Sequence, residues 1–424
     1  MSSLEKKIVI LLLLIFLVSS GFYVKNRTLT QEIPNFGGTY IEGTLSNSES
    51  ELSQTINNLT KVGLTTFDNE GKIVPDLAES WQISSDGLSY VFFLRSFAKS
   101  DEILDIIKSE KEEWSDISIS KVDDNKIKFD LKQPLGPFLA RTTDPLFPYG
   151  PYKIAKTSKT EITFESNKDY WQHTPYIDRI ILKLYPDSLS LEEALKTNKI
   201  MGAINSNADL NLKDYQKIQF SLPKYKMVFF NTVSESFQDK EVRKKLVRGE
   251  NLGKELNVRM AVLDNQKELE QAGNLVESWG NLGLKIIVEP YDALTMQKQI
   301  IPKKDYDMIL YGVNYGAEED LYPFFHSSQI KTDGLNFSNF SNHEADKILE
   351  DARLTTDPND RNKKYQDFKK ILDEEAPAYK VNQENVSYFI NNKVKGVEKI
   401  AHSVTVGGRF GNVVNWYIKT KKVK

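Results

Sequence analysis

The chain contains no cysteine among its 424 residues. This absence excludes disulfide bridges, thiolate zinc sites and cysteine nucleophiles. It also excludes an anchor attached through a lipid-modified cysteine. If the protein is exported, it must be held together by the packing of its core alone.

An excess of charge of one sign is also missing. The 56 Lys and Arg residues are balanced by 59 Asp and Glu residues. Nucleic-acid-binding proteins usually carry a basic excess, so we expect no nucleic-acid partner. The content of 40% hydrophobic and 11% aromatic residues is ample for large cores, and the length suits two or three domains.

The motifs of common enzymes are absent from the sequence. There is no G-x-S-x-G elbow, H-E-x-x-H helix, P-loop or G-x-G-x-x-G turn. The four histidines, His173, His326, His343 and His402, show no paired ligand spacing. A catalytic zinc site usually takes three protein ligands. We therefore expect no metal, no cofactor and no catalysis.

The N-terminal segment differs from the rest of the chain. After a short basic start, residues Ile8 to Val24 contain no charge. This run is near the lower length limit for crossing a bilayer and is long for the apolar part of a signal peptide. We expect residues 1–27 to be an uncleaved membrane anchor or a signal segment, with cleavage before Gly21 as the alternative. Residues 28–35 are expected to form a linker.

Hydrophobic periodicity predicts a β-rich first half and an α/β second half. Apolar runs separated by turn clusters predict strands such as 39–45 and 90–95. In the second half, the expected strands 256–263, 284–290 and 306–312 alternate with helical patterns. This alternation predicts an α/β unit with crossover connections.

Residues 315–330, with the sequence YGAEEDLYPFFHSSQI, follow the last strand of this unit. Ligand sites of α/β units collect at the carboxyl ends of strands, so the position suits a binding loop. The acids beside a histidine and hydroxyls could form a metal site, a hydrolytic site or a pocket for a cationic ligand. The alternative is a solvated acidic loop whose Phe324 and Phe325 anchor it in the core.

Several stretches together resemble a known family. The most specific is Pro75-x-Leu77-Ala78-x-Ser80-Trp81, followed by a Gly-x-x-Tyr-x-Phe-x-Leu-Arg strand. The chain resembles family 5 of the extracytoplasmic solute-binding proteins, the oligopeptide-, dipeptide- and nickel-binding components of ABC importers. The stretches that carry the resemblance are 64–95, 149–154, 167–182, 227–232, 239–246 and 326–379.

The resemblance implies an α/β, two-lobed, periplasmic-binding-protein-like fold with a hinge cleft and a small inserted third domain. Lobe I would consist of residues 36–58, 147–225 and 386–424. The inserted domain would cover residues 59–146, and lobe II residues 226–385. Closure about the hinge would trap the ligand between the lobes.

The resemblance also implies a function and a site. The chain would capture a peptide or a related small solute and deliver it to ABC permease subunits in the membrane. In peptide binders of the family, an acid in the loop after the strand that corresponds to residues 306–312 meets the α-amino group of the peptide. The expected ligand-binding residues are therefore Tyr315, Glu318, Glu319, Asp320 and Tyr322, with the two tyrosines as pocket walls.

The remaining expectations concern partners and departures from the family. We expect a monomer that is tethered outside the cytoplasm by its N-terminal helix, and we expect His326 to cap the loop that follows it. The chain is shorter than its relatives after residue 95 and after residue 250, which leaves peptide specificity open. A tethered sensor or chaperone-like binder and an extracellular hydrolase are the alternative functions.

Overall fold

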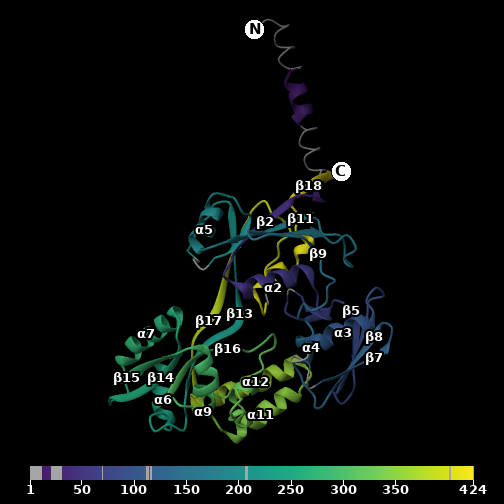
Figure 1. The fold of residues 1–424 in the computed structure, drawn as a ribbon. Coiled ribbons are helices and arrows are strands. Elements are labelled where there is room, and N and C mark those ends of the chain that lie inside the picture. The colour runs from purple at the N-terminus through teal and green to yellow at the C-terminus, as the bar shows by residue number, and fades with distance from the viewer. Residues whose placement is uncertain are drawn as a thin grey trace, which may run out of the picture.

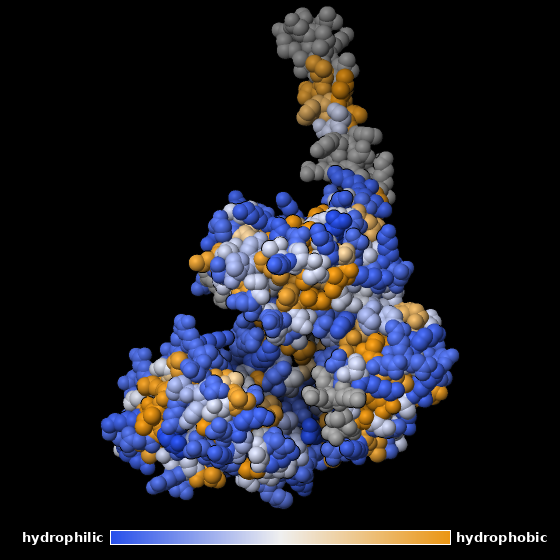
Figure 2. Space-filling model, viewed as in Figure 1, coloured by the Kyte–Doolittle hydropathy of each residue, from blue (hydrophilic) through white to orange (hydrophobic). Residues whose placement is uncertain are grey.

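The computed structural model describes residues 12–20, 31–68, 70–110, 114, 117–205, 209–400 and 403–423. Residues 12–20 form a helix that stands away from the globular part, and its apolar surface is visible in Figure 2. Within the described ranges, no helix is long and apolar enough to cross a membrane. The rest of the predicted anchor lies outside these ranges.

The predicted linker is in part a strand. Residues Gln31–Asn35 form β1, which pairs antiparallel with β18 (Lys419–Val423) at the other end of the chain. Only residues 28–30 of the predicted linker lie outside the described ranges. The sequence alone could not reveal this pairing, because the two strands are polar and lie at opposite ends of the chain.

A ten-stranded sheet extends through both lobes (Figure 1). Its order is β15-β14-β16-β13-β17-β12-β2-β11-β10-β9. The strands are β2 (Thr39–Leu45), β9 (Tyr152–Thr157), β10 (Glu161–Ser166), β11 (Arg179–Tyr185), β12 (Gly202–Ile204), β13 (Tyr215–Phe230), β14 (Leu256–Leu263), β15 (Leu284–Tyr291), β16 (Met308–Asn314) and β17 (Ala378–Asn391).

The long strands β13 and β17 connect the two lobes. They pair with each other, while β13 also pairs with β16 in lobe II and β17 also pairs with β12 in lobe I. Their register shifts between Ser221 and Tyr225. Pro223 lies within this shift, where its missing amide hydrogen costs no ladder hydrogen bond. The shift marks a place where the two strands can bend between the lobes.

Lobe I contains β2 and β9 to β12, together with α2 (Glu49–Thr60) and α5 (Ser188–Lys196). Its core includes the fully buried residues Tyr40, Ile180, Leu182 and Trp416. Trp416 comes from the C-terminal segment, which therefore completes the core of a lobe that begins near residue 39. The predicted strand at 39–45 is confirmed as β2.

The inserted domain has a separate four-stranded sheet with the order β5-β6-β8-β7. Apolar side chains from alternating positions of β6 and β8 contribute to its core, with Phe92 and Phe129 fully buried. Its elements are β3 (Thr65–Phe67), β4 (Ile73–Pro75), β5 (Ala78–Ile83), β6 (Ser89–Leu94), α3 (Ser100–Ser109), β7 (Ile117–Asp123), β8 (Lys126–Leu131) and α4 (Phe138–Arg141).

Lobe II contains the predicted α/β unit. Strand β14 pairs in parallel with both β15 and β16, as crossover connections require. The helices are α6 (Lys240–Arg248), α7 (Gln266–Gly280), α8 (Ala293–Thr295), α9 (Ile301–Lys303), α10 (Tyr322–Phe325), α11 (His343–Leu354) and α12 (Pro358–Glu375), with a π-helical turn, Met296–Ile300, between α8 and α9. The residue boundaries predicted for the three domains stay a prediction.

Candidate functional site

The acidic loop, residues 315–321, connects β16 to α10. It turns at Gly316, whose φ of +78° favours glycine. The amide of Gly316 donates to the Oδ1 atom of Asn314 at 3.0 Å. The amide of Tyr315 donates to the carbonyl of Pro223 at 2.9 Å, which ties the loop to the register shift in β13. The loop is therefore fixed against the strands that join the lobes.

Each of the three acids in this loop has a cationic partner within lobe II. Glu318 pairs with Arg361 near the start of α12. Asp320 pairs with Arg353 near the end of α11, at 3.1 Å. The third acid, Glu319, pairs with Lys369 in α12 at 2.7 Å. The loop is thus fastened to both helices by its own carboxylates.

The three ion pairs differ in burial. The side chains of Glu318 and Asp320 are 17% and 19% exposed, whereas that of Glu319 is 34% exposed. Burial raises the pKa of Glu318, and the charge of Arg361 opposes this rise. Burial likewise raises the pKa of Asp320, and Arg353 opposes it. Glu319 is therefore the acid that can exchange its partner at the lowest desolvation cost.

A pocket of about 700 Å³ lies beside the acidic loop. Glu319 and Lys369 line it on the polar side. Its apolar walls include Tyr225 of β13, Tyr315 of the loop and Phe325 of α10. Of the five predicted ligand-binding residues, this pocket brings together Tyr315 and Glu319.

The two tyrosines of the predicted site lie in different surroundings. The Tyr315 ring packs against Tyr225 with their centroids 4.8 Å apart, and burial raises the pKa of Tyr315. Tyr322 stacks on His326 at 4.1 Å and lies beneath the guanidinium of Arg353. Tyr322 is not among the residues that line the pocket beside the loop.

His326 caps the short helix Ser327–Gln329 that follows it. Its Nδ1 atom accepts a hydrogen bond from the amide of Ser328 at 3.0 Å, which confirms the predicted capping role. Phe324 and Phe325 are buried in the core of lobe II. In the described part of the chain, no three His, Asp or Glu side chains are grouped in a way that could hold a metal ion.

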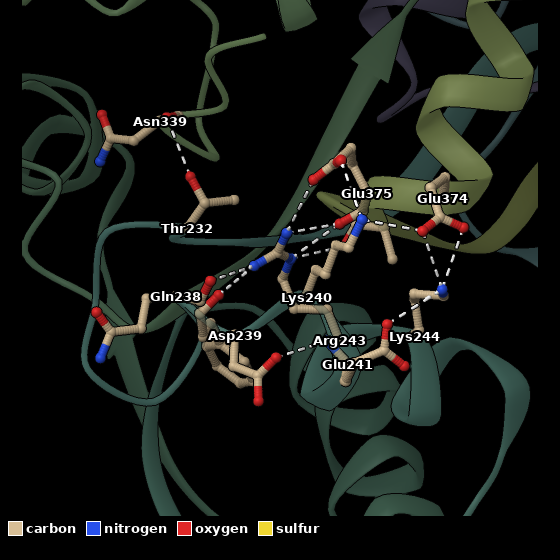
Figure 3. A network of polar contacts seen from close by, with 12 residues as sticks. Thr232, Gln238, Asp239, Lys240, Glu241, Arg243, Lys244, Asn339, Glu374 and Glu375 are labelled. Atoms are coloured by element: carbon tan, nitrogen blue, oxygen red, sulfur yellow. Dashed lines mark hydrogen bonds and ion pairs between the residues drawn. The ribbon is translucent and has the colours of Figure 1, made fainter.

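A network of charges joins α6 to the end of α12, as Figure 3 shows, and the neighbouring residues Asp373 and Ala376 line the pocket. Arg243 of α6 donates through its Nε atom to the carbonyl of Glu375 at 3.0 Å. Lys240 and Lys244 pair with Glu374 at 2.9 and 3.1 Å. Sequence reasoning missed this role of α6, whose residues 239–246 entered the sequence analysis only as one of the stretches that carry the family resemblance.

Comparisons with known proteins show similarity to one family of binding proteins. The family model described as "Bacterial extracellular solute-binding proteins, family 5 Middle" matches residues 103–248. The chain is 23% identical to the oligopeptide-binding protein AppA of Bacillus subtilis in an alignment 334 positions long, gaps included, which covers 62% of this chain and 58% of AppA. The middle part of the chain thus matches family 5 of the bacterial extracellular solute-binding proteins, and the chain is similar to a peptide-binding protein.

Solved structures confirm the predicted two-lobed fold. The structure of AppA from Bacillus subtilis in complex with a nonapeptide is similar with a TM-score of 0.68 and 19% identity, covering 91% of this chain and all of that one. The structure of HbpA2 from Haemophilus parasuis is similar with a TM-score of 0.77 and 16% identity, covering 87% and 98% of the two chains. The sequence match to AppA spans 58% of that relative's length.

Proposed function

We propose that this protein is the extracytoplasmic solute-binding component of an ABC importer and that it captures peptides. The observation that carries this proposal is the pocket of about 700 Å³ beside the acidic loop, at the junction of lobe II with the bending strands. A carboxylate, a lysine and aromatic walls in one pocket can bind both the charged end and the side chains of a peptide. The names of the relatives, which are peptide-binding proteins, support the same class of ligand.

Within this pocket, Glu319 is the proposed acceptor of the peptide's α-ammonium group. Glu318 holds Arg361, whose side chain is 4% exposed, and Asp320 holds Arg353, whose side chain is 26% exposed, so a turn of either acid to a ligand would leave a poorly solvated arginine unpaired. Glu319 holds Lys369, which is 39% exposed and can extend into solvent. An incoming ammonium group would take the place of the Lys369 ammonium group and keep the carboxylate paired.

This exchange sets the size of the expected effect. A hydrogen bond to a charged group contributes about 1.5–3 kcal/mol, and an exposed ion pair about 0–1 kcal/mol. When a desolvated ligand ammonium group replaces Lys369, the net gain in binding free energy is the first contribution minus the second. Glu319→Gln should therefore weaken binding roughly 10-fold.

A peptide library screened by thermal shift tests the function itself. A peptide at 100 times its dissociation constant should stabilise the protein by roughly 2.7 kcal/mol. A shift with sugars or metal ions and none with any peptide would refute the peptide assignment.

Two variants test the site with opposite expected signs. Glu319→Gln should weaken the binding of a free-amine peptide and leave its N-acetylated form unaffected. Lys369→Met removes the competing cation and should strengthen free-amine binding up to about 5-fold. Glu277→Gln, on the exposed side of α7, is the matched control. Equal losses for both peptide forms would remove the amine-binding role of Glu319.

The proposed mechanism involves capture and delivery without catalysis. Closure of the lobes about β13 and β17 would enclose the peptide, and ABC permease subunits would receive it. The N-terminal segment would tether a monomeric protein to the outer face of the membrane. The N-terminal residue of the mature protein tests the tether, since a chain that begins at Gly21 would contradict it.

A further inference from the structure

The inserted domain and lobe II contact each other directly, opposite the strands that join the lobes. Figure 1 shows α4 of the inserted domain beside the ends of α11 and α12, across the molecule from β13 and β17. At this contact, the amide of Gly136 donates to the carbonyl of Arg353 at 2.7 Å. Gly136 lies between β8 and α4, and Arg353 lies in the last turn of α11. The hydrogen bond therefore links the inserted domain to lobe II.

The contact is close enough to require glycine at residue 136. A Cβ atom at this position would lie 2.2 Å from the carbonyl oxygen of Thr355 and 2.7 Å from the Nη1 atom of Arg361. Both distances are shorter than van der Waals contact, so any side chain here would push the two bodies apart. The inserted domain also approaches lobe II closely at Gly87, where a Cβ atom would lie 3.4 Å from the side chain of Thr356.

The lobe II side of this contact is rigid. Arg361 is 3% exposed and donates through Nη1 to the carbonyls of Thr355 at 2.8 Å and Thr356 at 3.3 Å. Its Nη2 atom pairs with Glu318 of the acidic loop. The turn that receives Gly136 is thus held by the same arginine that holds the loop.

The inserted domain also lies close to this ion pair through β6. Burial raises the pKa of Tyr90, Arg361 lowers it and Glu318 raises it, so the phenol lies within electrostatic range of both charges. Tyr90 itself is buried in the core of the inserted domain. The Arg361–Glu318 pair therefore acts electrostatically on the core of the inserted domain.

We propose that this contact, between Gly136 and residues 353–361, is a latch that holds the two lobes closed before a solute binds. Every group that forms it belongs to the chain, so the latch needs no bridging ligand. Because it lies opposite the bend in β13 and β17, the lobes cannot separate without breaking it. If a solute can enter only the open form, its apparent affinity is lower than its affinity for the open form. The reduction factor is the fraction of molecules that are open.

The lack of cysteine allows a direct test by distance measurement. Val122→Cys on β7 and Lys370→Cys on α12 place one spin label on each body at exposed positions, with no other thiol in the chain. Pulsed electron paramagnetic resonance then reports the distance between inserted domain and lobe II without any added peptide. The result is independent of whether peptides are the correct ligand class.

With the latch intact, we expect one dominant short distance. Adding Gly136→Ala should lower the ratio of closed to open molecules roughly 5- to 30-fold, the size expected for the loss of one or two hydrogen bonds, and should add longer distances. Gly273→Ala is the control, because nothing lies within 4 Å of a Cβ at this position of α7.

Two results would overturn the latch. One is a broad distribution with longer distances in the labelled protein that retains Gly136. The other is an unchanged distribution in a folded Gly136→Ala variant. If Gly136→Ala fails to fold, the distribution measured with Gly136 in place still decides between a closed and an open protein.

Discussion

Replacing Arg361 by methionine is expected to destabilise the protein by about 3–5 kcal/mol. The side chain is 3% exposed, and it makes two hydrogen bonds to the carbonyls of Thr355 and Thr356 as well as the ion pair with Glu318. Each hydrogen bond contributes about 1 kcal/mol, and the charged pair about 1.5–3 kcal/mol. The variant also leaves the carboxylate of Glu318, which is 17% exposed, without its partner.

Urea denaturation of Arg361→Met and Lys369→Met tests this reasoning. Lys369→Met removes the partner of Glu319, but that pair is 39% and 34% exposed, so its loss should cost about 0–1 kcal/mol. The two variants thus remove a cation from neighbouring acids that differ mainly in burial. If Arg361→Met costs less than about 1 kcal/mol, burial does not distinguish these pairs and the argument for Glu319 as the exchangeable acid fails.

The cost of Arg361→Met should also depend on pH. Burial holds the folded-state pKa of Glu318 above its ordinary value of 4.5, and loss of the opposing charge of Arg361 raises it further. A carboxyl group with a raised folded pKa loses stability as pH rises above the unfolded pKa. The loss of unfolding free energy caused by Arg361→Met should therefore be smaller at pH 4 than at pH 7.5. An equal loss of unfolding free energy at both pH values would show that Arg361 does not lower the folded-state pKa of Glu318.

Three further predictions concern the rest of the molecule. Burial raises the pKa of Asp76 from 3.8 to about 7, so its ionisation destabilises the folded state increasingly as the pH rises from about 4 to about 7. Asp76→Asn should therefore add on the order of 3 kcal/mol to the unfolding free energy at pH 8 but little at pH 4. Arg409→Met should cost about 3–5 kcal/mol in urea denaturation, because its pair with Glu42 is fully buried on both sides. Gly283→Ala should lower the melting temperature, since its φ is +100° and a Cβ would lie 2.5 Å from the carbonyl of Lys254.

The elements of lobe II could be predicted because their signals are local. Strand β14 covers Leu256–Leu263, the range expected from its apolar run. Helix α7 begins after Asn265, whose side chain accepts from the amide of Glu268 at 3.1 Å, a cap that can be recognised from the sequence. The buried face of this helix was harder to predict, because Leu269 is 38% exposed while Leu275 is buried. Hydrophobic spacing identifies a helix more reliably than it identifies the face that packs.

The partners of the acidic loop could not be predicted in the same way. Arg353, Arg361 and Lys369 lie in two helices well beyond the loop, and the chain offers 56 lysines and arginines as possible partners. Nothing local marks these three, because each occupies a helix position where a solvated charge would be equally common. Only the packing of α11 and α12 against the loop selects them. The acids themselves were recognised, but their division into buried and exchangeable pairs depends on this packing.

That division explains how a loop of three adjacent acids can offer a single one to a ligand. A binding group has to be held close to its productive position by neighbours whose own conformations are fixed. Glu318 and Asp320 fix the loop backbone on both sides of Glu319 through Arg361 and Arg353. Exchange of Lys369 for a ligand ammonium group then requires the movement of one exposed side chain and no movement of the loop. On this argument, the pairs of Glu318 and Asp320, which are less exposed than that of Glu319, contribute to binding by keeping Glu319 in place, although neither would touch the ligand.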